Sequence, residues 1–270
     1  MFVSIWHANC STLGHQSCLP RTIESATIGS FMLTLAVDTS TRTGSIAILR
    51  DEEVLAQMAD ASGQRYSVTL CSGVATLLEG LDLSLDKLDL FAVCAGPGSF
   101  TGLRVGLTAV KAWAETLQKP ISSVSGLEAI AEQVVRRSAH LGDSILVPIL
   151  DARRGQVFGG VYRKSGDNSG PLQLLGEEVV SGANELLAIV GERAGALRPI
   201  FASATPDVIR SALERSAFSG CVVEEVSPVL APIIGLLGYR QALRGQVVDA
   251  LSLEANYVRR SDAEMKWEGE

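Results

Sequence analysis

The chain has 270 residues, of which 47% are hydrophobic and 20% charged, and its formal net charge is −7. This length can bury a sizeable core and is typical of two domains, or of two halves of one bilobal fold. A protein that holds nucleic acid unaided normally carries a basic face, so the acidic balance disfavours unaided binding of tRNA or DNA.

The cysteines and the first residues indicate in which cellular compartment the protein acts. The five cysteines are odd in number and include no C-x-x-C spacing, which argues against a zinc knuckle or a disulfide framework and fits a reducing cytoplasm. No run reaches the roughly eighteen apolar residues of a membrane-spanning helix. Residues 1–31 lack the basic start and apolar centre of a signal peptide, and we expect them to be a disordered extension outside the fold.

The folded region is predicted to begin with a three-stranded meander. Leu33–Val37 is apolar and β-prone and ends in a polar turn that starts at Asp38. Two further strand patterns follow, at Ser45–Leu49 and at Glu53–Met58. Short turns between β-prone runs predict antiparallel pairing of the three strands.

The pattern then becomes helical, from Gln64 to Leu81. One apolar stripe consists of Leu70, Val74, Leu77, Leu78 and Leu81. Val68, Cys71 and Ala75 extend the apolar surface around the helix. A helix that is apolar over most of its circumference must be covered on two sides. One cover is the sheet, and the other is either a helix of a partner or a neighbouring helix of the same chain.

A glycine loop lies at the centre of the first half. The apolar run Leu88–Ala95 predicts a buried strand, and Gly96-Pro97-Gly98-Ser99-Phe100-Thr101-Gly102-Leu103-Arg104-Val105-Gly106 follows it. Apolar residues from Leu103 to Leu117 recur at alternating spacings of four and three, which predicts a helix that ends before Lys119-Pro120. The junction is therefore expected to be strand, loop and helix.

Three interpretations of this loop compete. Gly96, Gly98, Ser99 and Gly102 could cradle a phosphate, although the spacing fits neither G-x-G-x-x-G nor the G-K-[S/T] of a P-loop. The loop could instead allow close packing of the helix start, because Gly102 and Gly106 clear one face of side chains. It could also be an ordinary turn with Ser99 or Thr101 as N-cap.

The second half echoes the first. After a strand at Ile121–Val124 and a helix at Gly126–Ala139, the strand Ile145–Leu150 ends in Asp151 and leads through a polar turn into the strand Gln156–Tyr162. The order of strand, aspartate, turn and strand repeats the opening of the fold and suggests two α/β halves, each opened by a hairpin. Further helices are expected at 184–190, 206–216, the latter with Pro206 at N1, and 229–244, alternating with strands at 200–202 and 221–226.

The chemistry-bearing residues are few. Asp38 and Asp151 end the two opening strands, where a bilobal ATPase would place carboxylates for Mg²⁺ and the attacking water if both faced one cleft. As turn-capping residues they need no ligand, and we favour that interpretation. His140 is the only histidine of the folded region, so neither a metal-ligand cluster nor a Ser/Cys–His nucleophile is supported.

Four segments together resemble the TsaB (YeaZ) family: residues 33–40, 96–106, 150–158 and 254–259. The resemblance runs from about Met32 to Trp267. It implies an α/β fold of the actin-like ATPase (ASKHA, ribonuclease H-like) type, with two duplicated lobes. We expect an N-terminal lobe at residues 32–122, which holds a dimerisation helix, and a C-terminal lobe at residues 123–270.

The resemblance also implies a function. By this resemblance, we expect the chain to be a non-catalytic dimerisation or scaffold subunit of the tRNA (adenosine(37)-N6)-threonylcarbamoyltransferase complex. The complex would need this subunit together with TsaD and the ATPase TsaE to form the modified nucleoside t6A. The sister family TsaD has a H-x-E-x-H metal motif after its glycine-loop helix, where this chain has Gly126-Leu127-Glu128-Ala129-Ile130. Glycine and isoleucine side chains cannot ligate a metal, so no such centre, no catalytic residue and no cofactor is expected here.

The partners are implied in the same way. The first long helix is expected to pair with TsaD, or with a second copy in a homodimer, through Tyr66, Leu70, Val74, Leu77 and Leu78. A charged residue at Val74 is expected to abolish pairing and to leave the fold intact. At the start of this helix the chain has Tyr66-Ser67, where the family commonly has His followed by Ser or Thr. tRNA is expected to bind only through the complex, in the cytoplasm, with no membrane contact.

Three alternatives stay open. The first is a free-standing ATPase or sugar-kinase-like protein that uses Asp38, Asp151 and the glycine loop. The second is a glycoprotease-like protein, which the missing metal motif and the missing nucleophile–base pair disfavour. The third is a homodimeric binding module with no role in tRNA modification.

Overall fold

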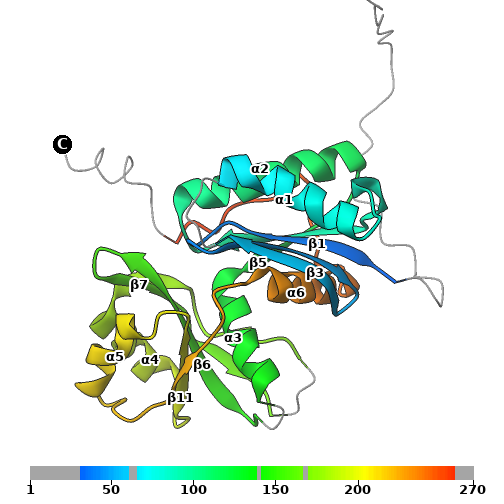
Figure 1. Ribbon diagram of the computed structural model, residues 1–270. Helices are drawn as coiled ribbons and strands as arrows, with labels where there is room; N and C mark the ends of the chain where they lie inside the picture. The colour runs from blue at the N-terminus through cyan, green and yellow to red at the C-terminus, as the bar shows by residue number, and fades with distance from the viewer. Residues whose placement is uncertain (1–30, 61–65, 139–140, 167–169, 259–270) are drawn as a thin grey trace, which may run out of the picture.

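The computed structural model describes residues 31–60, 66–138, 141–166 and 170–258 (Figure 1). Of the expected extension at residues 1–31, all but Phe31 lies outside the described residues. His140 lies outside them as well. The described chain forms two lobes, each built on one β-sheet with helices on both faces. In these ranges no helix has both the length and the apolar character needed to cross a membrane.

The first sheet has five strands in the order β3-β2-β1-β4-β5. Their bounds are β1 Leu33–Asp38, β2 Gly44–Arg50, β3 Glu53–Asp60, β4 Leu90–Gly96 and β5 Ile121–Ser125. The strands β1, β2 and β3 pair antiparallel as a meander, whereas β4 and β5 continue the sheet in parallel. The predicted meander is confirmed. Every residue of β1 and β4 is buried, as expected for strands that are covered on both faces.

The second sheet has seven strands, five of which follow the order β10-β7-β6-β11-β12. Their bounds are β6 Ser144–Arg153, β7 Gln156–Gly159, β8 Tyr162–Lys164, β9 Gln173–Leu174, β10 Val179–Gly182, β11 Pro199–Ser203 and β12 Val223–Glu225. The predicted single strand Gln156–Tyr162 is wrong, because the chain divides it at Gly160-Val161. The strand β7 pairs with the end of β6, and β8 pairs with its start.

The two sheets repeat one arrangement. The strands β6, β7 and β10 pair antiparallel like β1, β2 and β3, and β11 and β12 continue the sheet in parallel like β4 and β5. Asp38 is the last residue of β1, and Asp151 lies two residues before the end of β6, where the pairing with β7 becomes irregular. This confirms the expected duplicated α/β architecture, in which each half is opened by a hairpin.

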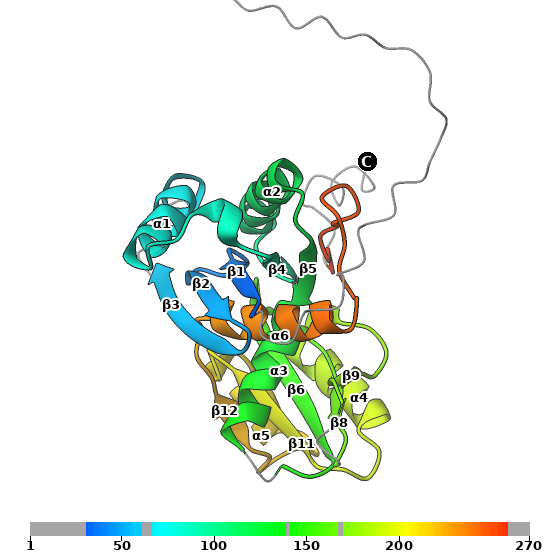
Figure 2. The same ribbon diagram turned by 90° about the vertical axis from the view of Figure 1, so that its right-hand side faces the viewer.

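The helices complete five layers. They are α1 Tyr66–Gly80, α2 Phe100–Leu117, α3 Gly126–Arg137, α4 Ala183–Arg193, α5 Asp207–Glu214 and α6 Ala231–Leu243, with a 3₁₀ turn at Leu85–Lys87. The helices α1 and α2 lie side by side on the outer face of the first sheet, and α6 lies along its inner face (Figure 2). An apolar core that includes α3 and α6 joins the two sheets, while α4 and α5 cover the far face of the second. Pro206 is the N-cap of α5 instead of its expected N1 residue.

The C-terminal part of the chain returns to the first lobe. A Cβ atom built on Gly235 would lie 2.2 Å from Leu49, and one on Gly238 would lie 2.6 Å from Ala92, so these glycines let α6 approach the sheet closely. Further on, Val248 exchanges backbone hydrogen bonds with Ile121. Residues 231–257 thus contact the first sheet, although we expected all of 123–270 to form the second lobe, and β5 continues past residue 122 to Ser125.

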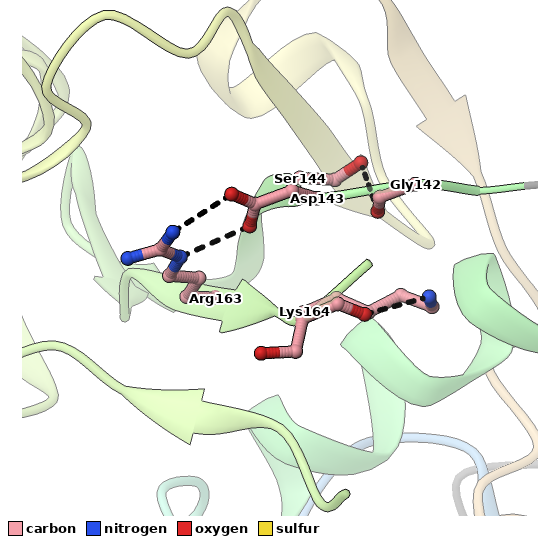
Figure 3. A network of polar contacts seen from close by, with 6 residues as sticks. Gly142, Asp143, Ser144, Arg163 and Lys164 are labelled. Atoms are coloured by element: carbon pink, nitrogen blue, oxygen red, sulfur yellow. Dashed lines mark hydrogen bonds and ion pairs between the residues drawn. The ribbon is translucent and has the colours of Figure 1, made fainter. Parts of the chain in front are cut away.

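A polar network fixes the start of the long strand β6 (Figure 3). The Arg163 guanidinium donates to both carboxylate oxygens of Asp143, at 3.0 and 2.7 Å, which holds the pKa of that carboxyl below its usual range. The buried Lys164 ammonium donates to the backbone oxygens of Leu141 at 2.6 Å and Ser165 at 3.2 Å. These contacts hold β8 against β6, and β8 carries Tyr162 toward the boundary between the lobes.

Candidate functional site

The glycine loop joins β4 to α2 through a cis bond between Gly96 and Pro97. Ser99 is the N-cap of α2, and its hydroxyl accepts a hydrogen bond from the Gly102 backbone N–H at 3.3 Å. The backbone N–H of Ser99 itself donates to the carbonyl oxygen of Ser40 at 2.7 Å. Two of the N–H groups that a phosphate cradle would use are therefore already bound within the chain.

The glycines of the loop lie against the chain's own backbone. A Cβ atom on Gly98 would lie 2.4 Å from the Ser40 carbonyl oxygen, and one on Gly102 would lie 2.1 Å from that of Thr39. One on Gly106 would lie 2.4 Å from the Thr39 hydroxyl, which donates to the Gly102 carbonyl oxygen at 2.7 Å. The contacts favour the packing interpretation of the loop, in which glycine is needed so that α2 can meet the turn after β1.

Asp38 is buried beneath the loop. Its side chain is enclosed, with 1% of the residue exposed, and Oδ1 accepts hydrogen bonds from the Ser40 backbone N–H at 2.8 Å and hydroxyl at 2.6 Å. Burial raises the pKa of Asp38, and the hydrogen bonds from Ser40 oppose this only in part. The other oxygen, Oδ2, has no hydrogen-bond partner among the described residues.

Asp151 closes the equivalent turn in the second lobe. Its Oδ1 accepts a hydrogen bond from the Arg153 backbone N–H at 2.7 Å, two residues on, as Asp38 does from Ser40. The turn-capping interpretation therefore accounts for both aspartates. A Mg²⁺–nucleotide, which the expected actin-like fold would imply, does not fit the first lobe: Asp38 is enclosed, and the loop glycines contact Thr39 and Ser40. We derive no reaction step through such a group.

The start of α3 is the segment where we expected no counterpart of the TsaD metal motif. The helix begins at Gly126, capped by the Ser125 hydroxyl, which accepts from the backbone N–H groups of Leu127 at 3.1 Å and Glu128 at 3.3 Å. Ile130 is 1% exposed and lies in the apolar core between the lobes. Within the described ranges, no three histidine, cysteine, aspartate or glutamate side chains are close enough together to hold a metal ion.

Glu128 in this first turn gives a pH-dependent prediction. Burial, and next the charge of Glu132, raise its pKa from 4.5 to about 7. The folded state therefore binds more protons than the unfolded state between these values, and stability falls as the pH rises through this window. We expect Glu128→Gln to leave the free energy of unfolding unchanged near pH 4, and to raise it by about 2 kcal/mol near pH 8, less than the full shift implies because the side chain is partly exposed.

Urea denaturation of both chains at the two pH values measures this effect. The matched control is Glu254→Gln, since Glu254 is exposed, and the control should follow the wild type at both values. A Glu128→Gln effect of the same size at low and high pH would contradict the assignment.

The expected contact residues of α1 face their own lobe. Leu70, Val74, Leu77 and Leu78 are all buried in the core formed with the first sheet. The Tyr66 hydroxyl accepts from the Gly44 backbone N–H at 2.6 Å and donates toward the carbonyl oxygens of the β1–β2 turn. The expectation that a charge at Val74 would leave the fold intact is wrong, because Val74 is 3% exposed.

The opposite side of α1 is exposed. We call it the α1 outer face; it consists of Val68, Cys71, Ser72, Ala75 and Thr76. Val68 is 73% exposed, the other four members are small and uncharged, and the exposed Glu79 lies one turn beyond Ala75. Small side chains let a second helix approach closely, and an uncharged face loses little hydration when it is covered. Sequence reasoning noted Val68, Cys71 and Ala75 as a second stripe without assigning them to a partner.

Comparison with known proteins identifies the family. Residues 54–221 match the family model described as TsaD, tRNA N6-adenosine threonylcarbamoyltransferase. The tRNA threonylcarbamoyladenosine biosynthesis protein TsaB of Bacillus subtilis is 33% identical over 246 residues, which cover 87% of this chain and 98% of that protein. The chain belongs to the TsaB family. TsaB of Escherichia coli is 29% identical over 133 residues, covering 49% of this chain and 56% of that protein.

A solved TsaB-family structure agrees with this fold. YeaZ from Pseudomonas aeruginosa superposes with a TM-score of 0.69 at 25% identity, covering 84% of this chain and 99% of that one. The segment that matches the TsaD model, residues 54–221, includes the glycine loop and the start of α3.

Proposed function

We propose that this chain is a non-catalytic subunit of the complex that transfers a threonylcarbamoyl group to adenosine 37 of tRNA. A TsaD-type subunit would perform the transfer, and TsaE would join as the ATPase. Membership of the TsaB family supports the pathway, since the named relatives are tRNA threonylcarbamoyladenosine biosynthesis proteins. The subunit would act in the cytoplasm, and with a net charge of −7 it would contact tRNA only within the complex.

The observation that carries the non-catalytic role is the packing of the glycine loop. In the first lobe, the Gly98 and Gly102 positions lie against the backbone of Thr39 and Ser40, so the space that a phosphate would use is filled by the chain itself. Asp38 lies enclosed beneath this contact and does not face a cleft. A chain with this arrangement keeps the actin-like architecture as a scaffold.

The α1 outer face is the surface we propose for the partner. It would pack against the corresponding helix of a TsaD-type subunit, burying Val68 and Ala75 at the centre of the contact. A second copy of this chain could use the same face, so a homodimer would compete with the TsaD-type partner.

Co-purification and nucleotide turnover test the proposal against its alternatives. A tagged TsaD-type subunit of the same organism should retain this chain, and the isolated chain should not hydrolyse ATP above background. ATP turnover that Asp38→Ala abolishes would instead favour the free-standing ATPase, which the actin-like fold keeps as a second candidate. Failure to bind the TsaD-type subunit, with a stable homodimer, would favour the binding module.

A further inference from the structure

One carboxylate joins the two lobes to the C-terminal segment. Glu178 lies in the second lobe, immediately before β10. Its Oε1 accepts hydrogen bonds from the Tyr162 hydroxyl at 2.5 Å and from the Ser125 hydroxyl. Its Oε2 accepts from the Asn256 side-chain amide at 2.6 Å. Tyr162 belongs to the second sheet and Ser125 to the first, so Glu178 bonds across the lobe boundary.

The third donor lies on a segment that we call the C-terminal strap, residues 248–257. The strap starts at the edge of the first sheet, where Val248 pairs with Ile121. Leu253 anchors it in the core of the first lobe with 1% exposed. At its end, the Asn256 backbone N–H donates to the Ala95 carbonyl oxygen at 2.7 Å.

The end of the strap also covers the start of α2. The Tyr257 ring packs on Phe100, with 5.0 Å between the ring centroids. The Arg104 guanidinium lies 3.8 Å from the centroid of the same Phe100 ring, and its Nε donates to the Tyr257 hydroxyl at 3.4 Å. Asn256 and Tyr257 thus connect Glu178 of the second lobe to the first turn of α2.

We infer that Glu178 is a clasp that holds the C-terminal strap against the second lobe and, through Asn256 and Tyr257, onto the first turn of α2. A carboxylate only accepts hydrogen bonds, and the Tyr162, Ser125 and Asn256 side chains all donate to it. The three hydrogen bonds can therefore form together only with Glu178 as the acceptor of each. Charge-assisted hydrogen bonds of this kind are stronger than neutral ones, and releasing any one partner loosens the other two. The position of the second lobe is therefore coupled to the order of the strap.

Exchanging the donor and the acceptor tests the clasp. Asn256→Asp places a second carboxylate beside Oε2 of Glu178, so that two acceptors face each other and repel. In Glu178→Gln/Asn256→Asp, the new Gln amide donates to the new Asp carboxylate, while the Gln oxygen still accepts from Tyr162 and Ser125. The double variant therefore restores the pair that the single variant breaks.

The readout is hydrogen–deuterium exchange of the full chain near pH 8. We expect Asn256→Asp to speed exchange in the peptides that cover 253–258 and 100–104 by about tenfold. The double variant should return to within about twofold of wild type, and Glu254→Gln, which alters a charge on the same strap, should behave as wild type. Unchanged exchange in Asn256→Asp, or a double variant as fast as the single one, would overturn the inference.

Discussion

Gly102→Ala is expected to lower the free energy of unfolding by about 4 kcal/mol. A Cβ atom at this position would lie 2.1 Å from the Thr39 carbonyl oxygen, which is backbone and cannot move aside as a flexible side chain can. Elsewhere in a helix the same change stabilises by up to about 1 kcal/mol, because alanine has the higher helix propensity. A loss of stability in Gly102→Ala would therefore come from the contact with the Thr39 carbonyl oxygen and not from helix propensity.

Gly80→Ala is the matched control. Gly80 ends α1, and a Cβ atom there would meet nothing within 4 Å. Denaturant titration should give a stability equal to or slightly above that of the wild type for Gly80→Ala, and a large loss for Gly102→Ala. A Gly102→Ala chain of normal stability that had lost affinity for a phosphate-bearing ligand would instead support the cradle interpretation.

Ala75→Glu on the α1 outer face is expected to weaken binding to a TsaD-type subunit by about 100-fold, because a carboxylate would be desolvated at the centre of the contact. Ala75 is exposed in the isolated chain, so the free energy of unfolding should change by no more than about 0.5 kcal/mol. Titration calorimetry or a quantitative pull-down measures the first quantity, and denaturation measures the second.

Two controls separate partner contact from folding. Ser211→Glu adds the same charge on an exposed position of α5 in the other lobe and should leave binding unchanged. Val74→Asp places a charge in the first-lobe core and should destabilise the chain itself. If Ala75→Glu and the wild type bound the TsaD-type subunit equally well, the partner contact would not lie on the α1 outer face.

Sequence patterns identified the elements with clear periodicity. The meander and α2 follow from runs that are either strictly β-prone or regularly apolar, and the equivalence of Asp38 and Asp151 follows from the repeated strand–turn–strand pattern. The strands β9 and β10 were missed, because they are two and four residues long and mostly polar or half-buried. Such strands depend on their neighbours for stability.

The functional surfaces were harder to derive. The outer side of α1 could not be told from its inner side, because apolar residues surround most of the helix, and only the structure shows which stripe meets the sheet. Glu178 gave no signal, since its partners Ser125 and Asn256 lie 53 and 78 residues away along the chain. Contacts of that separation are set by the duplicated fold and have no local pattern.

Reconstituted tRNA modification is the most direct measurement of the non-catalytic role. Supplied with tRNA, ATP and an activated threonylcarbamoyl donor, a mixture of a TsaD-type subunit, TsaE and this chain should form threonylcarbamoyladenosine. Leaving this chain out should reduce the yield to background. Folded Asp38→Asn chain should restore the yield, since Asp38 lies buried in a turn. Modification by this chain without the TsaD-type subunit, or a complete mixture that stays inactive with folded Asp38→Asn, would contradict the proposed role.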